Sequence, residues 1–318
     1  MSLNIIFMGT PEFSIPSLKT LKESNYKIVC VYTQSPKKKS RGQKISKTPI
    51  HIFSEGEGIK VKTTQLTDDQ EYEEFIKLKP DIVVVIAYGQ IIPERYLKTP
   101  NLIFLNVHAS LLPKWRGAAP IERAILNKES QTGISIMRIE KKLDAGPYIK
   151  QVKIQIDKNA TSGEIRKKLS VIGADALKES IELVIKGKAI FQKQKEKDAT
   201  YAKKIEKKET KINWHDTAEN IIAKINAFNP KPGAWFLLKN ERIKIIKAQE
   251  VGKMGREAEI LDDKFTVGCS VNAIQILRLQ KEGKREMDVK EFLVGNNLEK
   301  GTKLNWNLII KLSLNMTA

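Results

Sequence analysis

Two polar side chains stand side by side where an apolar run near the middle of the chain ends. Residues 102–105 have the length and β-rich character of a buried strand, and Asn106, Val107 and His108 follow them. Side chains alternate along a strand, so the Asn106 amide and the His108 imidazole point to one face. Ligands of parallel α/β sheets bind beyond the carboxyl ends of strands, so the pair is a candidate site for hydrogen bonding to a substrate. Packing explains such a pair equally well, and a third residue is needed.

Asp144 is the candidate third residue. It lies in the tight turn 143–147, between strand-like residues 133–139 and 148–156. Turn aspartates very commonly bond to their own backbone, and this is the simpler interpretation of Asp144 by itself.

The composition indicates a cytoplasmic protein with a nucleic-acid partner. The 318 residues are 41% hydrophobic and 29% charged, no run reaches the roughly 18 apolar residues of a membrane span, and the N-terminus lacks the basic region of a signal peptide. Cys30 and Cys269 are far apart, so no disulfide or metal site is expected. The net charge of +19 favours nucleic acid first and anionic membrane second, although a lysine-rich proteome would also produce it.

The first half of the chain alternates strands and helices. Residues 3–8 and 28–32 are strands joined by a turn and a helix, as in a βαβ unit. The turn Gly9-Thr10-Pro11 lacks the later glycines of GxGxxG, and GxxxxGK[ST] does not occur, so no dinucleotide or nucleoside-triphosphate site is expected. We expect a Rossmann-like, mostly parallel sheet with flanking helices. Further strands are expected at residues 81–87, 102–105, 133–139 and 148–156.

One polar segment interrupts the alternating strands and helices, and a second segment follows them. Residues 33–49 are either a solvated loop or an arm that contacts phosphates and becomes ordered on nucleic acid. Residues 190–207 are lysine-rich and predict a basic linker between a catalytic domain, 1–189, and a second domain, 208–318. The second domain has short strand-like runs that suggest a small OB-like β-barrel, a fold that commonly binds nucleic acid. These runs are residues 234–238, 242–247, 259–261, 265–267 and 273–279.

Five segments together are distinctive: IIFMGTPEF, VVVIAYGQIIP, NVHASLLPKWRGAAPI, TGISIMRIEKKLDAG and INAFNPKPGAW. Through them the chain resembles the methionyl-tRNA formyltransferases from end to end. The asparagine, histidine and SLLP elements are common to all folate-dependent formyltransferases, whereas WRGAAPI and AFNPKPGAW narrow the resemblance to the tRNA family.

The resemblance implies formyl transfer from 10-formyltetrahydrofolate to the α-amino group of methionyl-initiator tRNA, in translation initiation. Asn106, His108 and Asp144 would be catalytic, with the amide and a protonated imidazole donating to the formyl oxygen and the carboxylate passing protons. No metal or covalent intermediate is implied. The folate would lie against Ser110, Leu111, Leu112 and Pro113. The basic arm would engage the tRNA acceptor end through Lys37, Lys38, Lys39, Arg41 and Lys44, with Arg41 in the position of the family's key arginine.

Departures from the family pattern leave alternatives open. Ala109 stands where glycine is frequent, the arm reads SRGQK, and the stretch after Gly301 extends past the family's usual end. The acceptor could be a sugar amine, glycinamide ribonucleotide or water, and a catalytically dead tRNA-binding protein is the other alternative. The linker and barrel argue against a small acceptor, and the intact trio argues against a dead fold. A monomer is expected.

Overall fold

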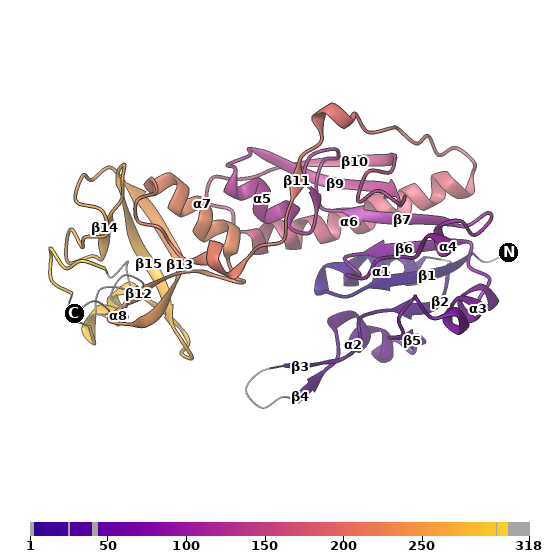
Figure 1. The fold of residues 1–318 in the computed structure, drawn as a ribbon, viewed down its shortest axis with the longest axis horizontal. Helices are drawn as coiled ribbons and strands as arrows, with labels where there is room; N and C mark the ends of the chain where they lie inside the picture. The colour runs from indigo at the N-terminus through magenta and orange to yellow at the C-terminus, as the bar shows by residue number, and fades with distance from the viewer. Residues whose placement is uncertain (1–2, 25, 40–43, 297, 305–318) are drawn as a thin grey trace, which may run out of the picture. The chain divides into compact units, whose positions relative to one another are not determined.

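The structure is a computed structural model that describes residues 3–24, 26–39, 44–296 and 298–304 (Figure 1). The chain forms two compact units. The first unit comprises residues 1–120, 131–155 and 166–203, and the second comprises residues 121–130, 156–165 and 204–318. Within the described ranges, no helix is long and apolar enough to cross a membrane. Most of the stretch after Gly301 lies outside the described residues, which end at residue 304.

A seven-stranded sheet forms the centre of the first unit, and the expected Rossmann-like α/β fold is confirmed. The sheet order is β10-β9-β7-β6-β1-β2-β5, with parallel pairing from β7 through β5 and antiparallel pairing of β9 with β7 and of β10 with β9. β6 is buried along its whole length, as expected for a strand covered on both faces. The strands are β1 (Asn4–Gly9), β2 (Lys27–Tyr32), β5 (Val61–Lys62), β6 (Ile82–Ile86), β7 (Ile103–His108), β9 (Gln131–Arg138) and β10 (Tyr148–Gln155).

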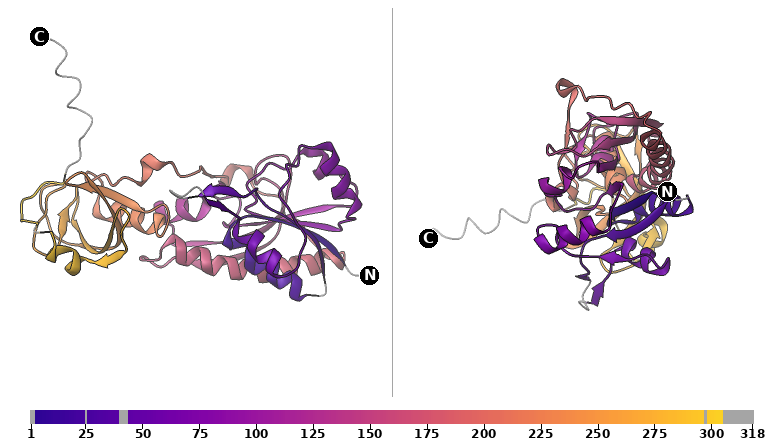
Figure 2. Two further views of the ribbon diagram at one scale, coloured as in Figure 1. Left: turned by 90° about the horizontal axis from the view of Figure 1, so that it is seen from below. Right: turned by 90° about the vertical axis from the view of Figure 1, so that its right-hand side faces the viewer.

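Helices cover both faces of this sheet (Figures 1 and 2). On one face α6 lies close to β7. A Cβ added at Gly173 of α6 would be only 2.9 Å from a Val107 methyl carbon. On the other face Phe75 of α3 and Tyr96 of α4 pack edge to face in a core that includes Phe104. The helices of this unit are α1 (Ile15–Glu23), α2 (Pro49–Gly56), α3 (Asp69–Lys77), α4 (Glu94–Leu97) and most of α6 (Ser162–Ile185), with the 3-10 turn η1 (Glu12–Ser14). Apart from its first residue, α5 (Pro120–Leu126) belongs to the second unit.

The chain from residue 186 to Lys203 is folded onto the first unit. Gln192 pairs with Tyr148 through their backbones, and β11 (Tyr201–Ala202) pairs in parallel with β8 (Arg116–Gly117). The 3-10 turn η2 (Glu196–Asp198) lies between these contacts. The basic composition of this segment therefore does not make it a simple spacer. The expected domain limits at residues 189 and 208 stay a prediction.

The second unit is an antiparallel sheet with helices, and the short strands expected in this part of the sequence form most of it. Its order is β12-β13-β15-β14, with β16 paired to β15. Trp214, Phe236, Phe265 and Phe292 are buried in its core. Residues 259–261, expected as a strand, contribute only isolated bridges, and the closed OB-like barrel stays a prediction. The elements are the 3-10 turn η3 (Lys207–Thr210), α7 (Ala218–Phe228), β12 (Ala234–Leu238), β13 (Glu241–Val251), β14 (Thr266–Gly268), β15 (Ala273–Lys281), β16 (Glu286–Asp288) and α8 (Val289–Val294).

Candidate active site

The last residues of β7 carry two of the three expected catalytic side chains. β7 pairs with β6 through Asn106 and Val85 and with β9 through His108 and Ser135. The strand pairs without irregularity from Leu105 to His108 along β9, so the Asn106 and His108 side chains lie on one face, as the alternation predicts. His108 is the final residue of the strand and is buried. The pair therefore stands at the carboxyl edge of the parallel strands, where α/β folds bind ligands.

Asp144 faces His108 across a turn. The distance from Asp144 Oδ2 to His108 Nδ1 is 3.7 Å. The same Oδ2 atom accepts a 2.8 Å hydrogen bond from the Gly117 backbone N–H, which is 27 residues away in the sequence. The carboxylate therefore reaches a different loop, and the simpler interpretation of a turn aspartate bonded to its own backbone is wrong here. The three side chains gather at one edge, while their catalytic roles stay a prediction.

The His108 ring lies between two acceptor groups. Nε2 lies 3.0 Å from the Trp115 carbonyl oxygen, and Nδ1 faces the Asp144 carboxylate. Both neighbours are hydrogen-bond acceptors, so a ring N–H on the Nε2 side can donate to the Trp115 carbonyl, while Nδ1 faces the carboxylate.

Asn106 has hydrogen-bonding capacity to spare. Its side chain is half-buried, and no described protein group is bonded to its amide. An amide offers two N–H donors and a carbonyl acceptor. Asn106 can therefore donate to a substrate oxygen without breaking a bond within the protein.

The loop Ser110 to Pro113, expected to contact folate, is tied into the protein. The buried Ser110 hydroxyl donates to the Lys114 carbonyl at 2.5 Å, and the Leu112 N–H donates to the Ser135 hydroxyl at 3.0 Å. Leu112 is buried, whereas Leu111 and Pro113 are half-buried. The loop therefore has a fixed shape, and its contact with folate stays a prediction.

Sequence reasoning missed a polar cluster behind the Asp144 turn. The Gln194 side chain bonds both Arg116 and the backbone of this turn, and the fully buried Arg116 guanidinium also pairs with Glu196 at 3.0 Å. Lys142 is a further partner of Glu196; this ammonium first, and then Arg116, lowers the pKa of the Glu196 carboxyl. The arginine of the WRGAAPI segment, Arg116, could have indicated this cluster, because an arginine between apolar residues requires polar partners when it is buried.

An open cavity of about 360 Å³ lies beside β7 in the same unit. Phe104 lines it and shares a face of β7 with Asn106 and His108, since the three positions alternate along the strand. Apolar side chains and the Arg138 guanidinium offer both stacking and polar contacts. The other lining residues are Glu94, Leu97, Lys98, Leu102, Ile139, Glu140 and Lys141.

The basic arm is partly described. β3 (Lys37–Lys39) and β4 (Lys44–Ser46) form a short antiparallel hairpin (Figure 1). Lys37 is exposed and donates to Gln34 at 3.0 Å. The side chains of Lys38, Lys39 and Lys44 and the whole of Arg41 lie outside the described residues. The tRNA contacts expected of these residues stay a prediction.

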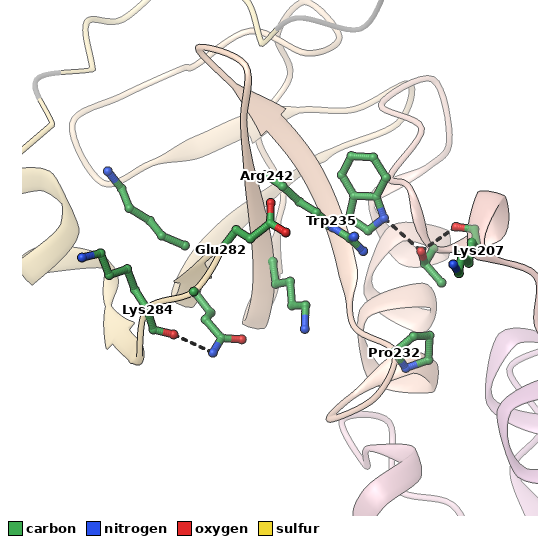
Figure 3. A pocket seen from close by; sticks show the side chains of 11 residues that line it. Lys207, Pro232, Trp235, Arg242, Glu282 and Lys284 are labelled. Atoms are coloured by element: carbon green, nitrogen blue, oxygen red, sulfur yellow. Dashed lines mark hydrogen bonds between the residues drawn. The ribbon is translucent and has the colours of Figure 1, made fainter. Parts of the chain in front are cut away.

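A basic cavity of about 610 Å³ lies in the second unit (Figure 3). The Arg242 guanidinium stacks on the Trp235 ring at 4.3 Å, and Trp235 Nε1 donates to the Thr210 hydroxyl at 2.9 Å. Glu282 is the carboxylate in the lining, against five cationic side chains. The lining residues are Lys207, Thr210, Pro232, Trp235, Arg242, Lys244, Gln280, Lys281, Glu282, Gly283 and Lys284. The sequence predicted nucleic-acid binding by this unit but not this cavity.

Among the described residues, no group of three or more histidine, cysteine, aspartate or glutamate side chains is arranged so that it could hold a metal ion. The two cysteines are buried and unpaired, and burial raises the pKa of the Cys30 thiol to about 11. Neither thiol has the environment of an activated nucleophile.

Two family descriptions together match most of the chain. "Formyl transferase" matches residues 3–181, and "Formyl transferase, C-terminal domain" matches residues 204–297. The chain therefore belongs to the formyl transferase family. The methionyl-tRNA formyltransferase of Pelagibacter ubique is 46% identical over 307 residues, covering 96% of this chain and 99% of the relative. The family resemblance expected from the sequence is thus confirmed.

Two solved structures share the fold at lower identity. The N-formyltransferase from Helicobacter canadensis, in complex with folinic acid and dTDP-3-aminofucose, has a TM-score of 0.67 at 23% identity and covers 88% of this chain and 100% of that one. The methionyl-tRNA formyltransferase from Clostridium thermocellum has a TM-score of 0.57 at 19% identity and covers 79% and 95%. At these identities the likeness establishes the fold alone.

Proposed function

We propose that this chain transfers the formyl group of 10-formyltetrahydrofolate to the α-amino group of methionine on initiator tRNA. The observation that carries the proposal is the convergence of Asn106, His108 and Asp144 at the carboxyl edge of the parallel strands, with a 3.7 Å contact between imidazole and carboxylate. The near full-length similarity to the Pelagibacter ubique enzyme supports methionyl-tRNA as the acceptor.

The geometry suits direct transfer through a tetrahedral intermediate. The amine nitrogen bonds to the formyl carbon, and negative charge develops on the formyl oxygen. The Asn106 amide donates to that oxygen, and His108 Nε2–H would do so in place of its contact with the Trp115 carbonyl oxygen, each contributing about 3 kcal/mol by analogy with oxyanion holes. The bond from the carbon to the folate N10 then breaks, and the proton lost by the amine reaches N10 through the His108–Asp144 pair.

The residues around β7 fit the folate co-substrate. The cavity beside Phe104 offers four apolar side chains that can pack on a fused heterocycle and five charged side chains that can hydrogen-bond to its edge. Because Phe104, Asn106 and His108 share one face of β7, a ring held there would direct N10 toward the catalytic pair. The Ser110 to Pro113 loop would flank the same path.

The second unit supplies an electrostatic surface for tRNA. Lys244 and Arg242 occupy alternate positions of β13 and line the basic cavity with the half-buried Trp235 ring. Cationic side chains next to an aromatic ring can neutralise phosphates and stack on bases. The Lys37 to Lys44 hairpin would add contacts at the acceptor end. The enzyme would act in the cytoplasm as a monomer.

The test is incubation of the purified chain with 10-formyltetrahydrofolate and methionyl-initiator tRNA. Formyl-methionyl-tRNA is the expected product, resolved by acid gel electrophoresis, and elongator methionyl-tRNA is the matched control acceptor. Formylation of a free sugar amine or release of formate without tRNA modification would contradict the proposal.

A further inference from the structure

We infer that Gln194 is a positioning residue that holds the Asp144 carboxylate against His108. Gln194 lies in the lysine-rich segment before the second unit and belongs to none of the motifs that carry the family resemblance. The inference deepens the proposed function and rests on it for its kinetic test.

The Gln194 carboxamide uses all of its bonding capacity inside the protein. Oε1 accepts from Arg116 Nε at 3.0 Å and from Arg116 Nη2 at 2.9 Å. Nε2 donates to the Asp144 carbonyl at 2.8 Å and to the Gly146 carbonyl at 2.7 Å. An amide has two donor hydrogens and an acceptor oxygen with two lone pairs, so no group is left for a substrate. Gln194 therefore acts through the two backbone segments that it joins.

The oxygen and the nitrogen of the Gln194 carboxamide each restrain a segment that orients the Asp144 carboxylate. On one side Gln194 fixes Arg116, whose neighbour Gly117 donates its N–H to Asp144 Oδ2 at 2.8 Å. On the other side it fixes the carbonyl of Asp144 itself. The side chain and the backbone of Asp144 are thus held from one amide, which sets the direction of the carboxylate toward His108.

The Asp144 turn needs such a restraint. Asp144 adopts a φ of 46°, in the left-handed region that non-glycine residues rarely adopt, and the neighbouring Leu143 side chain is 63% exposed. At Gly146 a Cβ would lie 1.9 Å from the Arg138 carbonyl oxygen, so the turn passes tightly against β9 at that end only. Packing of the Leu143 side chain therefore does not restrain this turn, and hydrogen bonds to Asp144 do.

Two substitutions separate the roles of the amide. Gln194→Glu keeps the acceptor for Arg116 but places an oxygen against the Asp144 and Gly146 carbonyls, and Gln194→Met removes all four bonds without adding charge. Gln192→Glu is the matched control, because Gln192 is exposed on the same segment and bonds through its backbone.

Both Gln194 variants are expected to lower kcat by about 10- to 100-fold, because small displacements of a catalytic group cost this much. KM for tRNA and for 10-formyltetrahydrofolate should change less than about twofold, since no substrate contact is lost. Gln192→Glu should match the parent in both constants. A parent-like kcat in both Gln194 variants, or a loss confined to KM, would overturn the inference while leaving the proposed function standing.

An NMR measurement tests the positioning whatever the acceptor is. The Gly117 amide proton, bonded to a carboxylate, should resonate downfield, and Asp144→Ala provides the reference shift for the broken bond. Gln194→Glu and Gln194→Met are expected to move the Gly117 resonance toward this reference, whereas Gln192→Glu is not. An unmoved Gly117 resonance in folded Gln194 variants would overturn the inference even if the formyl acceptor proved to be another amine.

Discussion

The catalytic edge of the first unit and the basic cavity of the second unit use polar side chains in opposite ways. At the edge His108 and Asp144 have partners at fixed positions, and Asn106 alone keeps its amide available to a substrate. In the cavity, by contrast, five cations surround about 610 Å³ of open space. Acyl transfer requires donors at defined positions, whereas phosphate attraction requires mainly charge. Substitutions at the edge should therefore act on kcat, and those in the cavity on tRNA affinity.

The largest effect is expected from His108→Ala. Loss of the imidazole removes a donor to the formyl oxygen and half of the proton-transferring pair, so kcat should fall by about 10³-fold or more. Steady-state formylation and a circular dichroism spectrum would check activity and fold. A folded variant that retains more than about a tenth of the parent's kcat would remove His108 from the mechanism.

Asn106→Ala is expected to have a smaller effect than His108→Ala. Removing one oxyanion donor costs about 10²- to 10³-fold in kcat. Because the Asn106 amide has no bonding partner among the described residues, the thermal midpoint should move little. Turnover and differential scanning fluorimetry on the same preparation test both statements. A strongly destabilised protein with normal turnover would mean that Asn106 is a packing residue.

In the cavity the double variant Arg242→Gln and Lys244→Gln should weaken tRNA binding by several-fold. The slope of the logarithm of affinity against the logarithm of salt concentration should fall by about 2, since two phosphate contacts are lost. KM for 10-formyltetrahydrofolate should stay unchanged. Filter binding at several salt concentrations measures the slope.

Lys264→Gln with Lys300→Gln is the matched control for this charge loss, because both lysines are exposed and lie outside the cavity lining. An equal change of slope in the control would mean that tRNA senses only the net charge of the unit. The claim that the cavity itself binds tRNA would then be wrong.

A third polar site, around Glu71, belongs to neither region. Substitution there should change only the stability of the protein, and this is the smallest effect that we expect. Glu71 is buried; burial by itself raises its pKa, but hydrogen bonds from Lys62, Thr64 and Tyr32 lower the pKa below its usual value. The stabilisation is therefore present above the unfolded-state pKa and is lost as the pH falls below about 4.5 through the lower, folded-state value.

Glu71→Gln should reduce the free energy of unfolding at pH 7 by about 1–3 kcal/mol and flatten its decline between pH 5 and pH 3. Urea unfolding across this range measures the change, with the exposed Glu73→Gln as control. A decline as steep as in the parent would assign the acid sensitivity to other carboxylates.

The part of the site that follows strand alternation was predictable from the sequence, and the part made by distant loops was not. Asn106 and His108 lie on one face because side chains alternate along a strand. The contact between Asp144 and the Gly117 N–H joins two loops, and no local pattern records it.

The lysine-rich segment shows the same limit. Its composition predicted a linker, yet Gln194, Thr200 and Tyr201 bond or pair with the residues that follow Pro113. Isolated polar side chains that hydrogen-bond to a loop produce no periodic pattern in the sequence. The prediction therefore rested on the lysine-rich composition alone. In β13, by contrast, Arg242 and Lys244 alternate in sequence, and only their assembly with Trp235 required the fold.

The most direct test of the account is single-turnover formyl transfer by Asp144→Asn. Asparagine keeps the size of the side chain and an acceptor for the Gly117 N–H, so only the charge facing His108 is lost. With labelled 10-formyltetrahydrofolate and methionyl-initiator tRNA, we expect the rate of transfer to fall by about 10²- to 10⁴-fold with tRNA affinity unchanged. A parent-like rate would contradict the claim that these three side chains act together on one formyl group.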